Sequence, residues 1–214
     1  MNFIFISPQF PKHYWNFCDR LKKNGVNVLG IGDSPYDALS DELKNALTEY
    51  YYLPHLDDYG EMVKAVGFFT FKYGKIDWIE SNNEFWLEQD ARLRTDFHVT
   101  TGEQYDHIDR IKNKSAMKAY YAKAGVPTAR LHKVTSFEAG RDFAHMVGYP
   151  VIVKPDNGVG ACDTYKLRSD DELAYFYATK PQSVPYVMEE FINGQIFSYD
   201  AILDSHSEPL FEST

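Results

Sequence analysis

The sequence predicts an α/β protein in which a parallel-sheet domain is followed by a smaller α+β lobe. Three observations lead to this prediction. Through residues 1–102, short apolar runs alternate with segments of helical periodicity. Segments of mixed charge and helical pattern then fill residues 103–127. Beyond them, short strands and two helices follow one another without the regular alternation of the first half.

The first hundred residues alternate between strand and helix four times. Continuous apolar runs predict four buried strands, at residues 3–6, 26–31, 51–53 and 76–79. Apolar positions at helical spacing predict the helices that follow them, at residues 13–24, 39–47, 59–66 and 84–93. This order is typical of an open, Rossmann-like parallel sheet with helices on both faces. Such sheets bind ligands beyond the carboxyl ends of their strands.

One segment at such a strand end is Gly30-Ile-Gly-Asp-Ser-Pro35. It resembles the start of a dinucleotide fingerprint, although it follows the second strand and a proline stands in place of the third glycine. A dinucleotide site is therefore one interpretation, and a plain strand-to-helix turn is the other.

A second segment at a strand end is Glu80-Ser-Asn-Asn-Glu84. Its carboxylates and amides could face a substrate amine, which makes Glu84 a candidate substrate residue. Alternatively, Asn83 caps the next helix and Glu84 is favourable in its first turn. Arg92 and Arg94 follow in that helix and could anchor an anion, but the favoured interpretation is that they are ordinary exposed arginines.

The middle of the chain predicts a connection between two domains. Asn113 is expected to cap a helix with an apolar stripe at Met117, Tyr120, Tyr121 and Ala124, and Gly125 to end it. The predicted division is residues 1–102, linker helices at 103–127, a first lobe at 128–185, and a linking segment with the start of a second lobe at 186–214.

The second half predicts an α+β lobe. Ser136 is expected to cap a helix that runs through Met146, and Ser169 with Glu172 to form a capping box for a helix near residues 170–178. The predicted strands are residues 131–134, 151–153, 164–167, 186–188, 197–203 and 209–211.

A phosphate-binding device is predicted at residues 149–160. The buried strand 151–153 leads directly into Lys154, and a loop with Gly158 and Gly160 follows. The lysine supplies a fixed positive charge, and the glycines allow backbone N–H groups to approach an anion closely. This stretch is typical of a site for a nucleoside triphosphate.

Charge, apolar runs and cysteine content argue against a nucleic-acid-binding, a membrane-spanning and a disulfide-bonded protein. The net charge of −9 argues against a nucleic-acid partner, which usually needs a basic face. No apolar run is long enough to span a membrane. Cys18 and Cys162 lie far apart and in no metal-binding spacing, so a reduced, cytoplasmic protein is expected.

Three motifs in order carry a resemblance to a known family. They are Asn113-Lys114 with Ala124-Gly-Val-Pro127, the stretch Tyr149-Pro-Val-Ile-Val-Lys-Pro155 with its glycine loop, and Val187-Met-Glu-Glu-Phe-Ile-Asn-Gly194. Together they resemble the ATP-grasp superfamily, in particular carbamoyl phosphate synthetase large chains and biotin carboxylases. The first half resembles the domain that precedes ATP-grasp in those proteins, so the resemblance covers essentially the whole chain.

The resemblance implies roles for the phosphate-binding residues. Lys154 corresponds to the strand lysine that contacts the α- and β-phosphates of ATP. Lys114 corresponds to a second lysine that reaches the nucleotide phosphates. Gly158 and Gly160 lie in the loop that closes over the triphosphate. A lysine is a suitable point charge for phosphate.

The resemblance also implies where the adenine lies. Glu189, Glu190, Phe191 and Ile192 correspond to the segment whose backbone groups recognise the adenine edge. Ile152 and Phe191 would then line the adenine face. The expected cofactors are ATP and magnesium, and the expected partner is a small carboxylate substrate. A homodimer is left open.

Three departures from the family pattern bear on function. Ile196 stands where many relatives have an acidic residue for the ribose hydroxyls. The loop that contains Cys162 has fewer glycines, and this cysteine is either close to the site or a small apolar filler. The chain ends at Thr214, so a fragment is expected, with an incomplete second lobe and magnesium ligands beyond residue 214.

The function implied by the resemblance is that of a ligase. It would activate a carboxylate as an acyl phosphate with ATP and pass it to an amine or thiol. Residues 1–214 alone are expected to be inactive, and no catalytic residue is assigned. The alternatives are a nucleotide-binding module without catalysis, for which Ile196 is the best support, and a dinucleotide-binding domain.

Overall fold

A computed structural model describes residues 1–214 apart from 159–161, 181–182 and 205. The chain divides into two compact units. The first contains residues 1–126 and 156–162, and the second contains residues 127–155 and 163–214.

The first unit contains a four-stranded parallel sheet in the order β3-β2-β1-β4. Its strands are β1 (Asn2–Ile6), β2 (Asn27–Gly32), β3 (Glu49–Tyr52) and β4 (Trp78–Glu80). Its α-helices are α1 (Trp15–Lys23), α2 (Asp41–Ala46), α3 (Tyr59–Tyr73), α4 (Leu87–Asp96), α5 (Asp109–Lys112) and α6 (Lys114–Lys123). Single turns of 3-10 helix are η1 (Lys12–Tyr14), η2 (Tyr36–Ala38) and η3 (Tyr105–His107).

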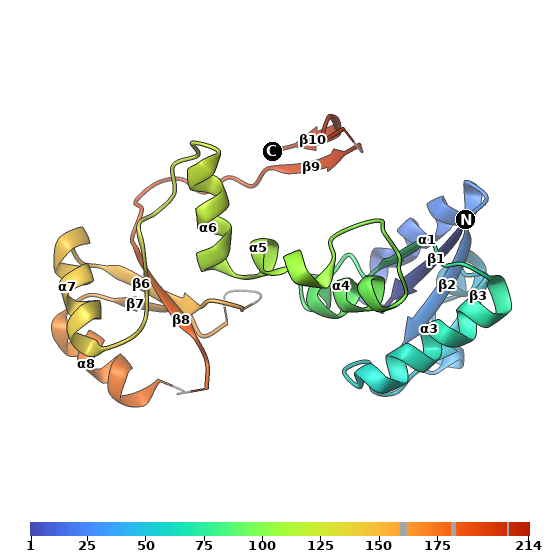
Figure 1. The fold of residues 1–214 in the computed structure, drawn as a ribbon, viewed down its shortest axis with the longest axis horizontal. Helices are drawn as coiled ribbons and strands as arrows, with labels where there is room; N and C mark the ends of the chain where they lie inside the picture. Colours follow the sequence, from blue (N-terminus) through green and yellow to red (C-terminus); the bar gives the residue numbers. More distant parts are fainter. Residues whose placement is uncertain (159–161, 181–182, 205) are drawn as a thin grey trace. The chain divides into compact units, whose positions relative to one another are not determined.

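The two faces of this sheet have separate apolar cores. Because side chains alternate along a strand, Ile4 and Ile6 point to one face and Phe3 and Phe5 to the other. The isoleucine face packs against α3 and α4. The phenylalanine face packs against α1 and α2. Figure 1 shows α3 along one face of the sheet and α1 on the opposite face. The predicted parallel sheet with helices on both faces is confirmed.

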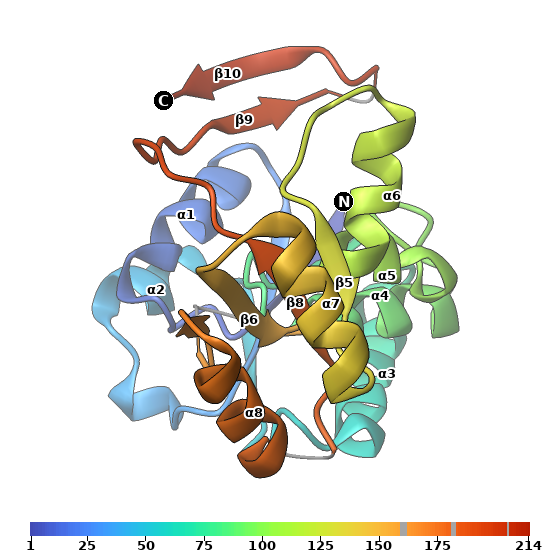
Figure 2. The same ribbon diagram turned by 90° about the vertical axis from the view of Figure 1, so that its left-hand side faces the viewer.

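The second unit contains a four-stranded antiparallel sheet in the order β5-β8-β6-β7. Its strands are β5 (Leu131–Lys133), β6 (Val151–Pro155), β7 (Tyr165–Leu167) and β8 (Tyr186–Glu190). Its helices are α7 (Phe137–Val147) and α8 (Asp170–Thr179), and both lie on one side of the sheet (Figures 1 and 2). A separate exposed hairpin is formed by β9 (Asp200–Leu203) and β10 (Pro209–Ser213).

The core of the second unit lies between the sheet and its two helices. Val151, Val153 and Met188 are fully buried there, with Phe143 of α7 and Phe176 of α8 packed against them. Alternation along β6 places Ile152 and Lys154 on the other face of the sheet. The predicted α+β architecture of this half is therefore confirmed.

The predicted caps of the second unit are present. The Ser136 hydroxyl accepts a hydrogen bond from the Ala139 N–H, at the start of α7. The Ser169 hydroxyl accepts one from the Glu172 N–H, at the start of α8. The Glu172 carboxylate, however, accepts from the Arg168 N–H, so the capping box is complete on one side only.

The N-terminal cap of α6 differs from the prediction. Asn113 makes no side-chain cap; instead the Asp156 carboxylate accepts from the Ser115 N–H at 2.8 Å and from the Ser115 hydroxyl at 2.6 Å. The apolar stripe is present in the sequence, but α6 has no buried residue, and Tyr120 and Tyr121 are 48% and 39% exposed. A side chain outside the helix thus makes the cap that local sequence assigned to Asn113.

The start of α4 also differs from the prediction. The helix begins at Leu87 and not at residue 84. The Asn83 side chain accepts a hydrogen bond from the Phe85 N–H at 3.0 Å, which stabilises a turn before the helix. No helix in the described part of the chain is long and apolar enough to cross a membrane.

Candidate functional site

Four residues define a polar face on the second unit, which we call the lysine face. It consists of Ile152, Lys154, Lys166 and Glu189, on the side of the sheet away from α7 and α8. The register places Ile152 between Glu189 on β8 and Lys166 on β7. Because paired residues in a sheet point to the same side, these side chains share one face with Lys154.

An ion pair lies at the centre of the lysine face. The Lys154 ammonium is 2.5 Å from the Glu189 carboxylate, and their side chains are only 27% and 11% exposed. Burial of this degree weakens solvent screening, so each charge holds the other in place. The strand-end lysine is thus a positioned cation, unlike a freely solvated surface lysine.

The chain leaves β8 at an aromatic residue. Phe191 and Ile192 follow the last paired residue of the strand, Glu190, so their backbone groups lie outside the sheet ladder. The Lys166 ammonium lies over the Phe191 ring, 3.6 Å from its centroid. Lys166 is a functional candidate that the sequence interpretation did not single out, although its alternation with Leu167 in a predicted strand was a usable signal.

Glu190 has a structural role through its side chain. Its carboxylate accepts hydrogen bonds from the backbone N–H and from Nε of Arg130, both at 2.7 Å. The Glu190 N–H in turn donates to the Arg130 carbonyl. These contacts fasten the start of β5 to the end of β8.

The predicted second lysine, Lys114, lies in the first unit at the start of α6. Its ammonium donates to the Gly158 carbonyl at 2.9 Å and to the Asp156 carbonyl at 3.4 Å. The loop after β6 is thereby tied to the first turn of α6, with Asp156 as its cap. Gly160 lies outside the described residues.

The segment after β4 is built around a buried charge network. Arg94 is 2% exposed, and its guanidinium donates to the Glu80 carboxylate at 2.7 Å and to the Ile79 and Glu103 carbonyls. The expectation that Arg94 is an exposed arginine is therefore wrong. Its charge is buried because a carboxylate and two carbonyls compensate it.

Glu84 lies at the surface beside this network. Its side chain is exposed, and its backbone carbonyl accepts a hydrogen bond from the Lys112 ammonium at 2.6 Å. Burial lowers the pKa of Lys112. Among the described residues, the Glu84 carboxylate takes part in no hydrogen bond and no ion pair within 4 Å, although its charge raises the pKa of Lys112 against the effect of burial.

The two glycines of the Gly30–Asp33 segment serve packing. A Cβ atom at Gly32 would lie 2.4 Å from Gln9 Oε1 and 2.5 Å from the Tyr50 hydroxyl. The Asp33 carboxylate accepts from the Gln9 amide at 2.6 Å. The space that a pyrophosphate would need beside Gly32 is occupied by side chains, which favours the plain-turn interpretation.

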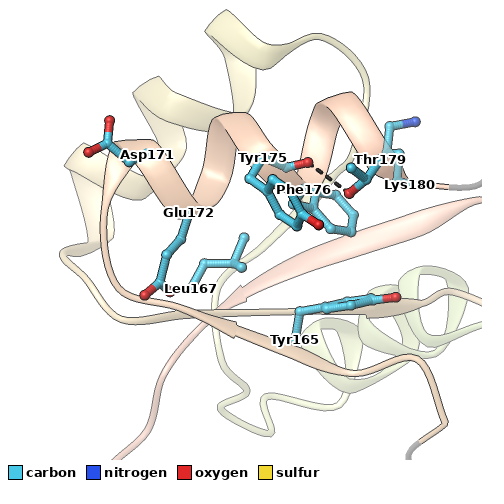
Figure 3. Close-up of a pocket in the computed structure, with 8 residues that line it drawn as sticks. All are labelled: Tyr165, Leu167, Asp171, Glu172, Tyr175, Phe176, Thr179 and Lys180. Carbon is cyan, nitrogen blue, oxygen red and sulfur yellow. Dashed lines mark hydrogen bonds between the residues drawn. The ribbon is translucent and has the colours of Figure 1, made fainter.

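A cavity of about 360 Å³ lies between β7 and α8 in the second unit (Figure 3). Aromatic side chains of Tyr165, Tyr175 and Phe176 line it, with Asp171 and Glu172 at one end. Tyr165 shares a strand face with buried Leu167, so this cavity is on the helix-covered side of the sheet and away from the lysine face. It contains none of the predicted nucleotide residues.

The structure shows the surroundings of two residues that depart from the family pattern, Ile196 and Cys162. Ile196 is 95% exposed, and Cys162 is an exposed free thiol, so Cys162 does not fill an apolar core. Among the residues that the structure describes, no group of three His, Cys, Asp or Glu side chains is arranged to hold a metal ion.

Comparisons with known proteins find similarity in sequence and in fold. Residues 109–197 match the family model of the carbamoyl-phosphate synthase L chain, ATP binding domain. The match spans Lys114, the strand with Lys154, and the segment from Glu189 to Ile192. All predicted nucleotide residues therefore fall inside the matched region.

Two curated relatives are longer than this chain. The L-arginine-specific L-amino acid ligase of Bacillus subtilis is 27% identical over 163 residues, which are 75% of this chain and 38% of the ligase. The carbamoyl phosphate synthase large chain of Clostridium botulinum (strain Alaska E43) is 25% identical over 197 residues, or 88% of this chain and 18% of the synthase. The chain thus spans less than half the length of either relative.

Solved structures share the fold. The biotin carboxylase domain of Hydrogenobacter thermophilus 2-oxoglutarate carboxylase, solved with MgADP, ADP and bicarbonate, has a TM-score of 0.70 at 21% identity. The alignment covers 88% of this chain and 44% of that one. The L-amino acid ligase of Bacillus licheniformis has a TM-score of 0.63 at 16% identity, covering 90% and 44%. With sequence similarity over residues 109–197 and fold similarity over most of the chain, the resemblance to the ATP-grasp superfamily is confirmed.

Proposed function

We propose that this chain binds ATP on the lysine face and forms the ATP-binding part of an ATP-dependent ligase. The ligase would transfer the γ-phosphoryl group of ATP to a carboxylate. The resulting acyl phosphate would then be attacked by an amine or a thiol, with release of phosphate. In this proposal residues 1–102 precede the ATP-grasp region, and residues 128–185 form its first lobe.

The observation that carries the proposal is the position of Lys154. It is a half-buried cation at the end of β6, paired with the Glu189 carboxylate on the neighbouring strand. A triphosphate offers several oxygens to the same ammonium and would replace or share that pairing. Since Glu189 holds the ammonium on the lysine face beforehand, binding costs less side-chain entropy.

The end of β8 provides a suitable place for adenine. The backbone groups of Phe191 and Ile192, which lie beyond the paired residues of β8, can pair with the N–H donor and ring-nitrogen acceptor of the adenine edge. Ile152 offers an apolar surface two residues before Lys154 on the same strand face, and the Phe191 ring offers an aromatic one. The base and the phosphates would then lie along one strand face.

The other predicted ligands are proposed from the resemblance. Lys114 and Gly158 would contact the phosphates, and Glu84 a substrate amine. Magnesium would supply charge for phosphoryl transfer. No described residue of this chain is assigned to the metal.

The test is isothermal titration of MgATP into the complete protein and into Lys154→Met. Loss of a charge-assisted contact costs roughly 1.5–3 kcal/mol, so the affinity should fall about ten- to a hundred-fold. Lys180→Met is the matched control, because Lys180 lines the cavity on the opposite side of the sheet. Equal affinity of the Lys154 variant and the unmodified protein would contradict the proposal.

The second candidate is a nucleotide-binding module without catalysis. It is favoured by Ile196, which offers no carboxylate to the ribose. Phosphate release from ATP, measured with panels of carboxylates and amines or thiols, distinguishes the two. ATP binding without phosphate release across the panel would favour the module.

A further inference from the structure

A second cavity, in the first unit, lies between the starts of α3 and α4. Its volume is about 270 Å³, close to the lower end of ligand pockets, which begin at about 300 Å³. Four aromatic rings line it: Tyr59, Phe85, Trp86 and Tyr105. Phe85 and Trp86 meet edge to face with centroids 4.6 Å apart, and Phe85 is 61% exposed. The cavity therefore offers an accessible aromatic wall.

The cavity also contains a cation that is held away from carboxylates. The Arg92 guanidinium stacks on the Tyr59 ring, 3.7 Å from its centroid. The Tyr59 hydroxyl donates to Asp96 at 2.5 Å, which fixes the ring. Glu88 and Arg92 are four residues apart in α4, a spacing that usually favours an ion pair. Within the described residues, Arg92 forms no ion pair within 4 Å.

Two carboxylates and one amide complete the polar lining. Asp57 and Glu88 are exposed and likewise take part in no ion pair among the residues that the structure describes. The Gln89 side-chain nitrogen is buried and donates no hydrogen bond to any described residue. The cavity thus contains a guanidinium, an amide donor and two carboxylates. Among the described residues, the guanidinium forms an ion pair with neither carboxylate.

We propose that this cavity binds a free α-amino acid with an aromatic side chain. The ligand carboxylate would accept from Arg92 and Gln89, and its ammonium would donate to Asp57 and Glu88. Its ring would pack against the aromatic wall. A phosphate would be repelled by the two carboxylates, and a metal ion by the guanidinium, so a zwitterion fits the lining best. This site uses none of the residues assigned to ATP.

The test is titration of the complete protein with L-phenylalanine and with two analogues that each lack one charge. These are 3-phenylpropanoate, without the ammonium, and 2-phenylethylamine, without the carboxylate. We expect each analogue to bind at least roughly tenfold more weakly than L-phenylalanine, because each loses its charge-assisted hydrogen bonds. Arg92→Met should weaken L-phenylalanine binding by a similar factor, and Arg92→Lys by less.

Arg141→Met is the control, since Arg141 also lies over an aromatic ring, that of Phe137 in the second unit, at 5.7 Å from its centroid. Glu88→Gln tests the ammonium side with an exposed residue, and it should weaken binding of L-phenylalanine but not of 3-phenylpropanoate. MgATP affinity should be unchanged in Arg92→Met, which separates this site from the proposed nucleotide site. Equal affinity for the three ligands, full affinity in Arg92→Met and Glu88→Gln, or no saturable binding up to about 10 mM would overturn the proposal.

Discussion

The buried carboxyl group of Asp90 predicts that the stability of the protein falls as pH rises. Asp90 is completely buried in α4, and its Oδ2 accepts from the Ser81 N–H at 3.0 Å and from the Ser81 hydroxyl at 2.6 Å. Its other oxygen is buried without a hydrogen-bond partner among the described residues. Burial, followed by the nearby charge of Glu80, raises the pKa of Asp90 to about 8.

The sign follows from proton linkage. In the unfolded chain an aspartate titrates near its ordinary pKa of about 3.9. Between that value and the folded pKa, the folded state binds the extra proton, so raising the pH favours unfolding. Each pH unit in this window costs at most about 1.4 kcal/mol. Across the whole window, from about 3.9 to about 8, the upper limit is about 6 kcal/mol, with the loss complete above pH 8.

The measurement is urea unfolding followed by circular dichroism from about pH 5 to about pH 8. Asp90→Asn cannot ionise, so its free energy of unfolding should depend less on pH than that of the unmodified protein. Asp41→Asn is the control, because the Asp41 side chain is 93% exposed and should leave the slope unchanged. Equal slopes for Asp90→Asn and the unmodified protein would refute the reasoning.

Two further predictions concern packing and capping. Gly32→Ala should lower the free energy of unfolding by about 1–3 kcal/mol, because the added methyl group would meet Gln9 and Tyr50; unchanged urea unfolding would show that this space is not needed. Asp156→Ala removes the side-chain cap of α6 and should cost about 0.5–2 kcal/mol. Faster amide hydrogen exchange at Ser115 would report the lost cap, and unchanged exchange would contradict its role.

Much of the fold could be predicted because it depends on local periodicity. The apolar run that begins at Phe3 became β1, and Gly25, with a φ of +77°, follows the end of α1 as expected. Ser136 and Ser169 cap helices because a cap needs only residues three positions apart. The residues that make up each of these signals lie close together in the chain, so the signals can be recognised from the sequence alone.

The features that the sequence did not predict depend on contacts between residues far apart in the chain. Arg94 looks like any helix arginine until Glu80 and Glu103 are brought around it by folding. Asp156 caps a helix that begins 42 residues earlier in the chain, at Lys114. No local rule predicts such partners, because the free energy of a buried charge depends on groups that only the folded chain assembles.

The candidate nucleotide site could be predicted from the sequence only in part. The strand and glycine loop around Lys154 predict its role in phosphate binding, and the side of the sheet that it occupies follows from alternation with Val153. Its pairing with Glu189 and the position of Lys166 over Phe191 required the strand register. Strand register is a non-local property, which the sequence of one strand does not determine.

Backbone amide chemical shifts, recorded by NMR while ATP is added to the complete protein, test the nucleotide proposal most directly. The proposal predicts the largest changes at Lys154 and at Phe191 and Ile192, where the phosphates and the adenine edge would bind. The cavity beside Tyr175 and the turn at Gly32 should show small changes. Large changes at either of those places, with none at Phe191 and Ile192, would contradict binding on the lysine face.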